Sequence, residues 1–372
     1  MRKSKFFGSF KSFLSSFLPG SARVSLLAWA VARKYRAPQL VFPYECGPSP
    51  RLLVILPEDP LAALHQVSCL VSLEAHFKPG HVAVLCERRV TPFFKTIGGI
   101  SKFMEYDAAD RYLFSREFDR IGREISSGRW DMCLMLEPKP DLALLYSAGK
   151  SAAPVRIGIK GAGDYPFLNL HVNPAPGRTY LTDRGLLVAA MLGVPLRPKA
   201  RWSVTKESAE EAGLMLREMN VPPASRLIGI DGVYFFSRHG RQWTQSLVDM
   251  LQKKSFVCYL FSHDEPGGDA ALWAGEQNLP LFTNLPAARS AAIIFKSEFV
   301  VAGPTVLFEL ADLLGTPAVG VFEEGEIGTF CRDSETTRGL RYVSRPDEAT
   351  IDSIEQCVDA MAAKQVNTGV RP

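Results

Sequence analysis

The chain has 372 residues, of which 47% are hydrophobic and 22% are charged. This composition is typical of a folded protein, and the length is sufficient for two domains. The seven cysteines are scattered, odd in number and without a C-x-x-C pair, so we expect reduced thiols, no disulfide framework and no zinc site. The absence of a P-loop, a G-x-S-x-G elbow, a protein-kinase motif set and an H-E-x-x-H motif excludes those enzyme classes.

Positive charge is concentrated at the start of the chain. Residues 1–44 contain eight basic residues and no acidic one, although the formal net charge of the whole chain is only +4. Between Phe6 and Leu18, phenylalanine and leucine recur at intervals of three and four, opposite lysines and serines. A basic helix with an aromatic face is typical of an anchor that lies on an anionic membrane surface. We therefore expect residues 1–36 to contact a membrane.

Two alternatives stay open for this segment. The helix could instead pack on the body of the protein, or the acid-poor start could be an organelle transit peptide. No stretch reaches the roughly 18 to 20 apolar residues that a bilayer-spanning helix needs. The residues from Pro38 to Pro50 then predict a linker.

The first α/β half begins at Arg51. An apolar run at residues 52–56 predicts a buried strand, residues 61–77 predict a helix, and residues 81–85 predict a second strand, which together form a βαβ unit. The turn between the first strand and the helix contains Asp59, which is well placed to cap the helix N-terminus.

The rest of this half continues the alternation of strands and helices. A strand is predicted at 130–137, helices at 142–148 and 181–192, and a loop at 160–176. Residues 197–204 are expected to connect the two halves.

The second half repeats the α/β pattern. Helices are predicted at 206–219, 245–251 and 287–295, strands at 227–231 and 256–261, a loop at 232–240, and a last strand and helix within 341–365. The loop is followed by Arg241, whose guanidinium can bind phosphate in a bidentate way; a solvated basic loop is the alternative. Glu265 follows the second of these strands, a common place for a carboxylate in any α/β fold.

The stretch from Phe299 to Phe322 predicts a strand, a tight turn, a helix and a second strand. Such a βαβ unit requires a parallel sheet. In the turn, Gly303 permits close approach of the backbone, and Thr305 offers a hydroxyl beside the free N–H groups of a helix N-terminus. The turn favours phosphate, although many such turns in α/β proteins are empty.

This stretch resembles the nucleotide-sugar signature of glycosyltransferase family nine, the ADP-heptose:lipopolysaccharide heptosyltransferases. Members read Ser-Gly-Ser/Asp-Thr-Gly-Pro-Met-His-Leu-Ala, followed by Ala-Leu-Gly-x-Pro. Here the corresponding frame runs from Ala302 to Ala311, followed by Leu314-Gly315-Thr316-Pro317. The resemblance covers about residues 51–362. The frame departs from the family at Val306, which replaces a glycine, and at Glu309, which replaces the histidine.

The resemblance implies a role for several residues of this chain. Asp59 stands at the position of the family's general base, with Glu58 in place of a glycine. Arg241 stands at the lysine of Lys-x-Trp that meets the donor diphosphate. Glu265 would accept hydrogen bonds from the nucleoside. Gly303, Thr305 and Glu309 belong to the donor-binding turn and its helix.

The resemblance also implies a fold and a function. We expect two Rossmann-like domains facing a cleft (the GT-B type), at residues 51–200 on the acceptor side and 201–372 on the donor side, after a basic amphipathic segment and linker at 1–50. The expected activity is inverting transfer of a sugar from a nucleotide-diphosphate donor to lipopolysaccharide or another lipid-linked glycan. We expect this transfer to proceed without a metal ion or other cofactor, and we expect no nucleic acid among the partners.

The expected location is cytoplasmic and peripheral, on the inner face of the cytoplasmic membrane. A catalytically inactive glycosyltransferase-like scaffold or binding protein at the membrane stays open as the alternative, because Glu58, Val306 and Glu309 depart from the family's donor-site pattern.

Overall fold

The computed structural model describes residues 33–41, 46–97, 100, 102–109, 111, 115–159, 167–174, 180–197, 202–222, 225–262, 268–331, 337–342 and 348–368. The predicted amphipathic helix before residue 33 lies outside the described residues. Within the described part of the chain, no helix is long and apolar enough to cross a membrane.

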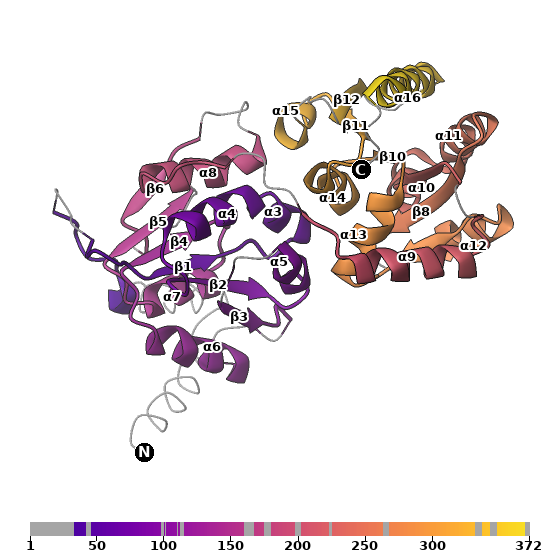
Figure 1. Cartoon of the computed structure of the whole chain (residues 1–372). Coiled ribbons are helices and arrows are strands. Elements are labelled where there is room, and N and C mark those ends of the chain that lie inside the picture. Colours follow the sequence, from indigo (N-terminus) through magenta and orange to yellow (C-terminus); the bar gives the residue numbers. More distant parts are fainter. Residues whose placement is uncertain are drawn as a thin grey trace, which may run out of the picture. The chain divides into compact units, whose positions relative to one another are not determined.

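Two six-stranded parallel sheets form the framework (Figure 1). The first, sheet A, has the order β3-β2-β1-β4-β5-β6 and is built from β1 (Leu52–Ile55), β2 (Val82–Glu87), β3 (Lys102–Tyr106), β4 (Met132–Met135), β5 (Val155–Ile159) and β6 (Leu170–Val172). The second, sheet B, has the order β12-β11-β10-β7-β8-β9 and is built from β7 (Leu227–Ile230), β8 (Val257–Ser262), β9 (Leu281–Thr283), β10 (Phe299–Ala302), β11 (Ala318–Glu323) and β12 (Thr337–Tyr342).

Helices connect most of the successive strands, as is usual for parallel pairing. In the described part of the chain they are α3 (Pro60–Leu64), α4 (Val67–His76), α5 (Thr91–Ile97), α6 (Arg116–Ser127), α7 (Leu142–Lys150), α8 (Leu181–Met191), α9 (Lys206–Glu218), α10 (Gly232–His239), α11 (Arg241–Lys253), α12 (Gly268–Glu276), α13 (Ala287–Lys296), α14 (Val306–Leu314), α15 (Ile327–Phe330) and α16 (Glu348–Thr368).

The chain divides into two compact units. The first comprises the described residues of Met1–Leu56, Phe77–Glu87 and Ser101–Asn173, and it contains sheet A with α6 and α7. The second comprises those of Pro57–His76, Arg88–Ile100 and Pro174–Pro372, and it contains sheet B and the remaining helices. The domain boundaries predicted from the sequence stay predictions.

The core of the first unit lies between sheet A and the helices α6 and α7. Leu53 and Ile55 of β1 pack in one buried cluster with Ile125 of α6 and Leu144 of α7. The central strands β1 and β4 consist of apolar residues without alternation, which is typical of strands buried on both faces of a parallel sheet.

Sheet B is covered by helices on both faces. Val319 and Val321 of β11 belong to a core cluster that includes residues of α10, α11, α12 and α16. Phe322 instead packs against Phe308 of α14, with ring centroids 5.1 Å apart. Because successive strand residues point to opposite faces, α14 covers the face opposite α16.

The predicted βαβ unit at 299–322 is confirmed as β10, α14 and β11, with β10 and β11 paired in parallel. The loop predicted at 232–240 is wrong, because most of it forms α10. Phe235 of this helix is fully buried in the core of sheet B, and Gly240 ends the helix with a φ of 88°. The run between Gly232 and Gly240 contains no helix breaker, so burial of its aromatic face is enough to stabilise a helix.

Candidate functional site

The strand order of sheet B places two turns of the chain next to each other, at the carboxyl ends of β7 and β10. β7 pairs with β8 on one side and with β10 on the other, and the chain continues from β7 and from β10 in opposite directions across the sheet. In open parallel sheets, ligands bind outside the carboxyl ends of the two strands at such a switch point. Here these ends lead directly to Asp231 after β7 and to Gly303 after β10.

Asp231 and the predicted phosphate turn are bonded to each other. The Thr305 hydroxyl donates a hydrogen bond to Oδ2 of Asp231. The Asp231 backbone N–H donates to the carbonyl of Val301 in β10, at 2.9 Å. The structure therefore joins Gly303 and Thr305, which the sequence predicted as donor-binding residues, to a carboxylate that the sequence did not single out.

Asp231 is buried, with only 4% of the residue exposed. Burial disfavours its charged form and raises the pKa to about 7, although the Thr305 hydroxyl and the N–H groups of Tyr234 and Gly303 favour the carboxylate. The switch point of sheet B thus contains an acid that changes charge near neutral pH.

The N-terminus of α14 has no side-chain cap. Thr305 occupies the N-cap position in extended backbone, but its hydroxyl bonds to Asp231 rather than to the first turn of the helix. The N–H groups of the first helical turn have no intrahelical acceptor and carry the positive end of the helix dipole, which favours an anion. Val306 begins this helix, where right-handed helical backbone requires no glycine, so its replacement of the family's glycine is compatible with the turn.

Gly303 is required by close packing in the turn. A Cβ atom at this position would lie 2.2 Å from the ring of Tyr234 in α10. A side chain here would displace the Tyr234 ring, so the glycine lets this ring pack closely on the end of β10.

Glu309, which replaces the family's histidine, is buried in α14 at 3% exposure. Its Oε2 lies 3.1 Å from Nδ1 of His65, which is itself 1% exposed. His65 Nδ1 also lies 3.2 Å from the Thr182 hydroxyl. All three residues belong to the second unit. The buried glutamate therefore lies beside an imidazole, but its Oε2 has no hydrogen-bond partner among the described residues.

Arg241 is the first residue of α11 and lies at the surface. Its Nη2 donates to Oε2 of Glu276 in α12 at 2.6 Å, and both side chains are more than half exposed. Exposed ion pairs of this kind contribute about 0 to 1 kcal/mol, so a phosphate can compete for the guanidinium. The adjacent Arg238 pairs with Glu323 at the end of β11.

Asp59 caps α3, as one interpretation of the sequence predicted. Its Oδ1 accepts a hydrogen bond from the N–H of Ala62 at 2.8 Å, and the side chain is exposed. It comes four residues after the end of β1, the strand at the switch point of sheet A. Its role as a general base stays a prediction. Glu265 lies outside the described residues, and its nucleoside contact also stays a prediction.

Sequence reasoning missed Asp231 and His65. Asp231 was the last residue of a predicted strand, and a polar residue at that position would have been a candidate if the strand order had been known. His65 interrupts an apolar helical pattern, and only the folded chain places it next to Glu309. No cluster of three or more potential metal ligands occurs in the described ranges.

Comparison with solved structures gives the class of the fold. A glycosyl transferase of family 9 from Veillonella parvula superposes with a TM-score of 0.70 at 12% identity, covering 85% of this chain and 97% of the other. The E. coli ADP-heptose LPS heptosyltransferase II gives a TM-score of 0.67 at 14% identity, covering 85% and 99%. The E. coli heptosyltransferase WaaC with ADP gives 0.61 at 16% identity, covering 84% and 99%.

No protein-family model and no curated protein matches the chain. The solved structures nevertheless show that it has the fold of the family-nine glycosyltransferases, with two Rossmann-like sheets. The resemblance found in the sequence is thereby confirmed at the level of the fold.

The raised pKa of Asp231 predicts a pH-dependent stability. An unfolded aspartate has a pKa of about 4, whereas Asp231 has a pKa of about 7 in the folded chain. The protonated group therefore stabilises the fold fully below about pH 4, and this contribution is lost as the pH rises through about 7. One pKa unit corresponds to about 1.4 kcal/mol. Between pH 4 and pH 8, the free energy of unfolding of wild type should therefore fall by up to about 4 kcal/mol relative to that of Asp231→Asn, because the asparagine does not titrate.

Urea unfolding at several pH values measures this difference. Asp249→Asn, which changes an exposed carboxylate of α11, is the matched control and should follow wild type at every pH. If Asp231→Asn also follows wild type throughout, the buried carboxyl group does not titrate near neutral pH.

Proposed function

We propose that this protein is an inverting glycosyltransferase that transfers a sugar from a nucleotide-diphosphate donor to lipopolysaccharide or another lipid-linked glycan. The observation that carries the proposal is an uncapped helix N-terminus at the switch point of sheet B, in a chain with the fold of the family-nine glycosyltransferases. Similar solved structures include a heptosyltransferase with ADP, which supports a nucleotide donor for this chain.

The donor would bind at the carboxyl edge of sheet B. Gly303 permits close backbone approach, and the first turn of α14 after Thr305 offers N–H groups to the diphosphate. Arg241 would exchange its exposed partner Glu276 for a phosphate, and Glu265 would accept hydrogen bonds from the nucleoside. Glu309 lies in the same helix, beside His65.

The chemistry requires a base and a stabilised leaving group. An acceptor hydroxyl attacks the anomeric carbon, the bond from that carbon to the diphosphate breaks, and Asp59 takes the hydroxyl proton. Arg241 and the positive end of α14 would stabilise the negative charge that develops on the departing nucleoside diphosphate. These groups need no metal ion for the transfer.

The acceptor class follows from the start of the chain. Residues 1–36 are basic and amphipathic in sequence, and we assign them to the surface of the cytoplasmic membrane, on its inner face. An enzyme held at this surface would reach a lipid-linked glycan without leaving the aqueous phase.

A second candidate function is a catalytically inactive, glycosyltransferase-like scaffold at the membrane. The observation that favours it is the hydrogen bond that the Asp231 carboxyl group accepts from the Thr305 hydroxyl, because this hydroxyl at the predicted phosphate turn already has a partner. When charged, this group repels a diphosphate. The two functions differ in whether a nucleotide binds at all.

Calorimetric titration with a panel of nucleoside diphosphates and their sugars tests the proposal. One nucleotide should bind wild type, and Arg241→Ala should weaken its binding by about tenfold or more through loss of a charge-assisted contact. Glu276→Gln is the matched control, because it frees Arg241 from its partner and should leave the affinity equal or higher. Failure of every nucleotide to bind would favour the scaffold.

Asp59→Asn separates the two roles of Asp59. Asparagine is as good an N-cap as aspartate, so the free energy of unfolding should change by less than about 0.5 kcal/mol. Its amide cannot accept the proton, so sugar transfer should fall by about 10² to 10⁴ while donor affinity is retained. Asp59→Ala should lose the cap as well, at about 1 kcal/mol. Undiminished transfer by Asp59→Asn would remove this residue from the mechanism.

A further inference from the structure

The first described residues of the chain, which begin at residue 33, attach to the first unit through Tyr35. Nη1 of Arg156 in β5 donates a hydrogen bond to the Tyr35 carbonyl at 2.8 Å. The Tyr35 ring meets that of Tyr146 in α7 edge to face, with centroids 4.5 Å apart and hydroxyls 3.2 Å apart. A second attachment follows at Pro38, whose carbonyl accepts from Nδ2 of Asn169 at 3.0 Å.

This docking depends on a glycine in α7. A Cβ atom at Gly149 would lie 2.6 Å from Cβ of Tyr35 and 3.4 Å from its carbonyl oxygen. The tyrosine backbone therefore packs directly on the helix. The place at which the preceding basic sequence joins the folded body is set by this contact.

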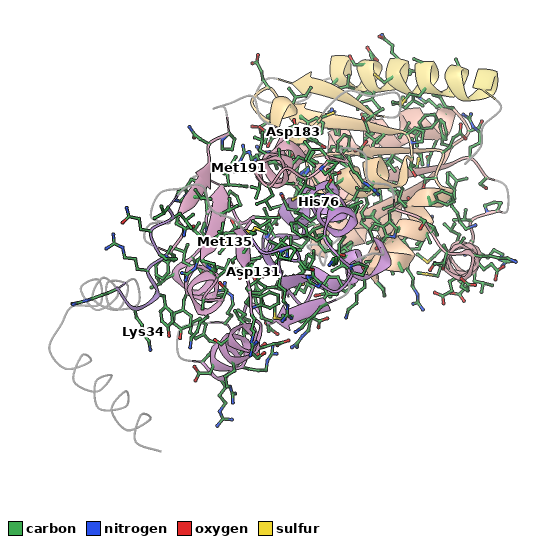
Figure 2. All side chains as sticks on the ribbon, turned by 60° about the vertical axis from the view of Figure 1, so that its left-hand side comes forward. Lys34, His76, Asp131, Met135, Asp183 and Met191 are labelled. Carbon is green, nitrogen blue, oxygen red and sulfur yellow. The ribbon has the colours of Figure 1, made fainter. Side chains whose placement is uncertain are left out.

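Cations surround the docked ring. The ammonium groups of Lys34 and Lys150 lie 5.2 and 5.5 Å from the centroid of the Tyr35 ring, and Lys150 also lies 5.3 Å from that of Tyr146. Arg33, Lys34 and Arg36 are exposed, and Lys34 projects at the periphery of the first unit (Figure 2).

The electrostatics of the two tyrosines agree with this geometry. Burial raises the pKa of Tyr35, but the hydrogen bond with Tyr146 and the ammonium group of Lys150 outweigh it, so that its pKa is lowered overall. Burial raises the pKa of Tyr146, and Asp119 of α6 adds to that effect. Asp119 is thus an acidic neighbour of the tyrosine pair and offsets part of the positive charge of Lys34 and Lys150 there.

We propose that Arg33, Lys34, Arg36 and Lys150 form one cationic surface that contacts the anionic headgroups of a lipid layer, with Tyr35 holding the basic segment against α7. The inference rests on the membrane assignment in the proposed function and adds the face of the folded body that meets the lipid. Residues 1–32 add further basic residues and no acidic one. Their phenylalanines and leucines suit the acyl boundary of a membrane, whereas a nucleic acid offers no such apolar layer.

Vesicle co-sedimentation of the full chain tests this surface. Wild type should bind vesicles that contain phosphatidylglycerol far better than vesicles of phosphatidylcholine alone, and added salt should weaken the binding. Lys150→Glu should lower the affinity by at least about fivefold, since each cation near an anionic surface contributes about that factor. Lys253→Glu makes the same charge change on an exposed position of α11 and should bind as wild type does.

Gly149→Ala tests the docking without changing any charge. The added methyl group should displace Tyr35, so that trypsin cleaves after Arg33, Lys34 or Arg36 faster than in wild type, and vesicle binding should fall. Thermal unfolding verifies that each variant is folded.

Each contrary result has a separate meaning. If Lys150→Glu binds vesicles as wild type does, or if Gly149→Ala speeds cleavage without weakening binding, the inferred surface is overturned while the membrane anchor stands. Equal binding to neutral and anionic vesicles would also overturn it. If wild type binds no vesicle, both the anchor and the surface are wrong. None of these outcomes depends on nucleotide binding or sugar transfer.

Discussion

The hydrogen bond from the Thr305 hydroxyl to the buried carboxyl group of Asp231 is the contact on which the candidate donor site depends. It joins the residues that follow β7 and β10, the two strands at the switch point of sheet B. Because this bond takes the hydroxyl that would otherwise cap α14, the first N–H groups of the helix stay without a side-chain partner. The same interaction therefore fixes the turn and leaves its N–H groups available to an anion. The ionisation of Asp231 then controls how favourable the binding of that anion is.

Two buried carboxyl groups, those of Asp231 and Glu309, belong to this candidate site. Burial raises the pKa of Asp231 to about 7, so its carboxyl group loses its charge as the pH falls through neutrality, and Glu309 lies beside His65. Protonation lowers the cost of burying Asp231, whereas Oε2 of Glu309 is buried without a hydrogen-bond partner in the described structure, 3.1 Å from Nδ1 of His65. The chain thus folds with Val306 and Glu309, which depart from the family-nine frame, in its candidate site.

Much of the second sheet could be predicted from the sequence, because its apolar runs and glycines give strong local signals. The unit of β10, α14 and β11 was predicted almost to the residue, and Asp59 was recognised as a possible helix cap. Local pattern could not show that α10 is a helix, since its stability comes from burying Phe235 against the sheet. Asp231 and His65 were missed because their importance arises from strand order and from contacts between residues far apart in the chain.

Hydrogen exchange of the full chain, with and without a saturating nucleoside diphosphate, tests most directly whether the switch point of sheet B is the donor site. The account predicts slower exchange of the backbone amides of Val306, Leu307 and Phe308 when the nucleotide is present, because these N–H groups would donate to its phosphates. Exchange that slows elsewhere in the chain while these three amides stay unchanged would contradict it.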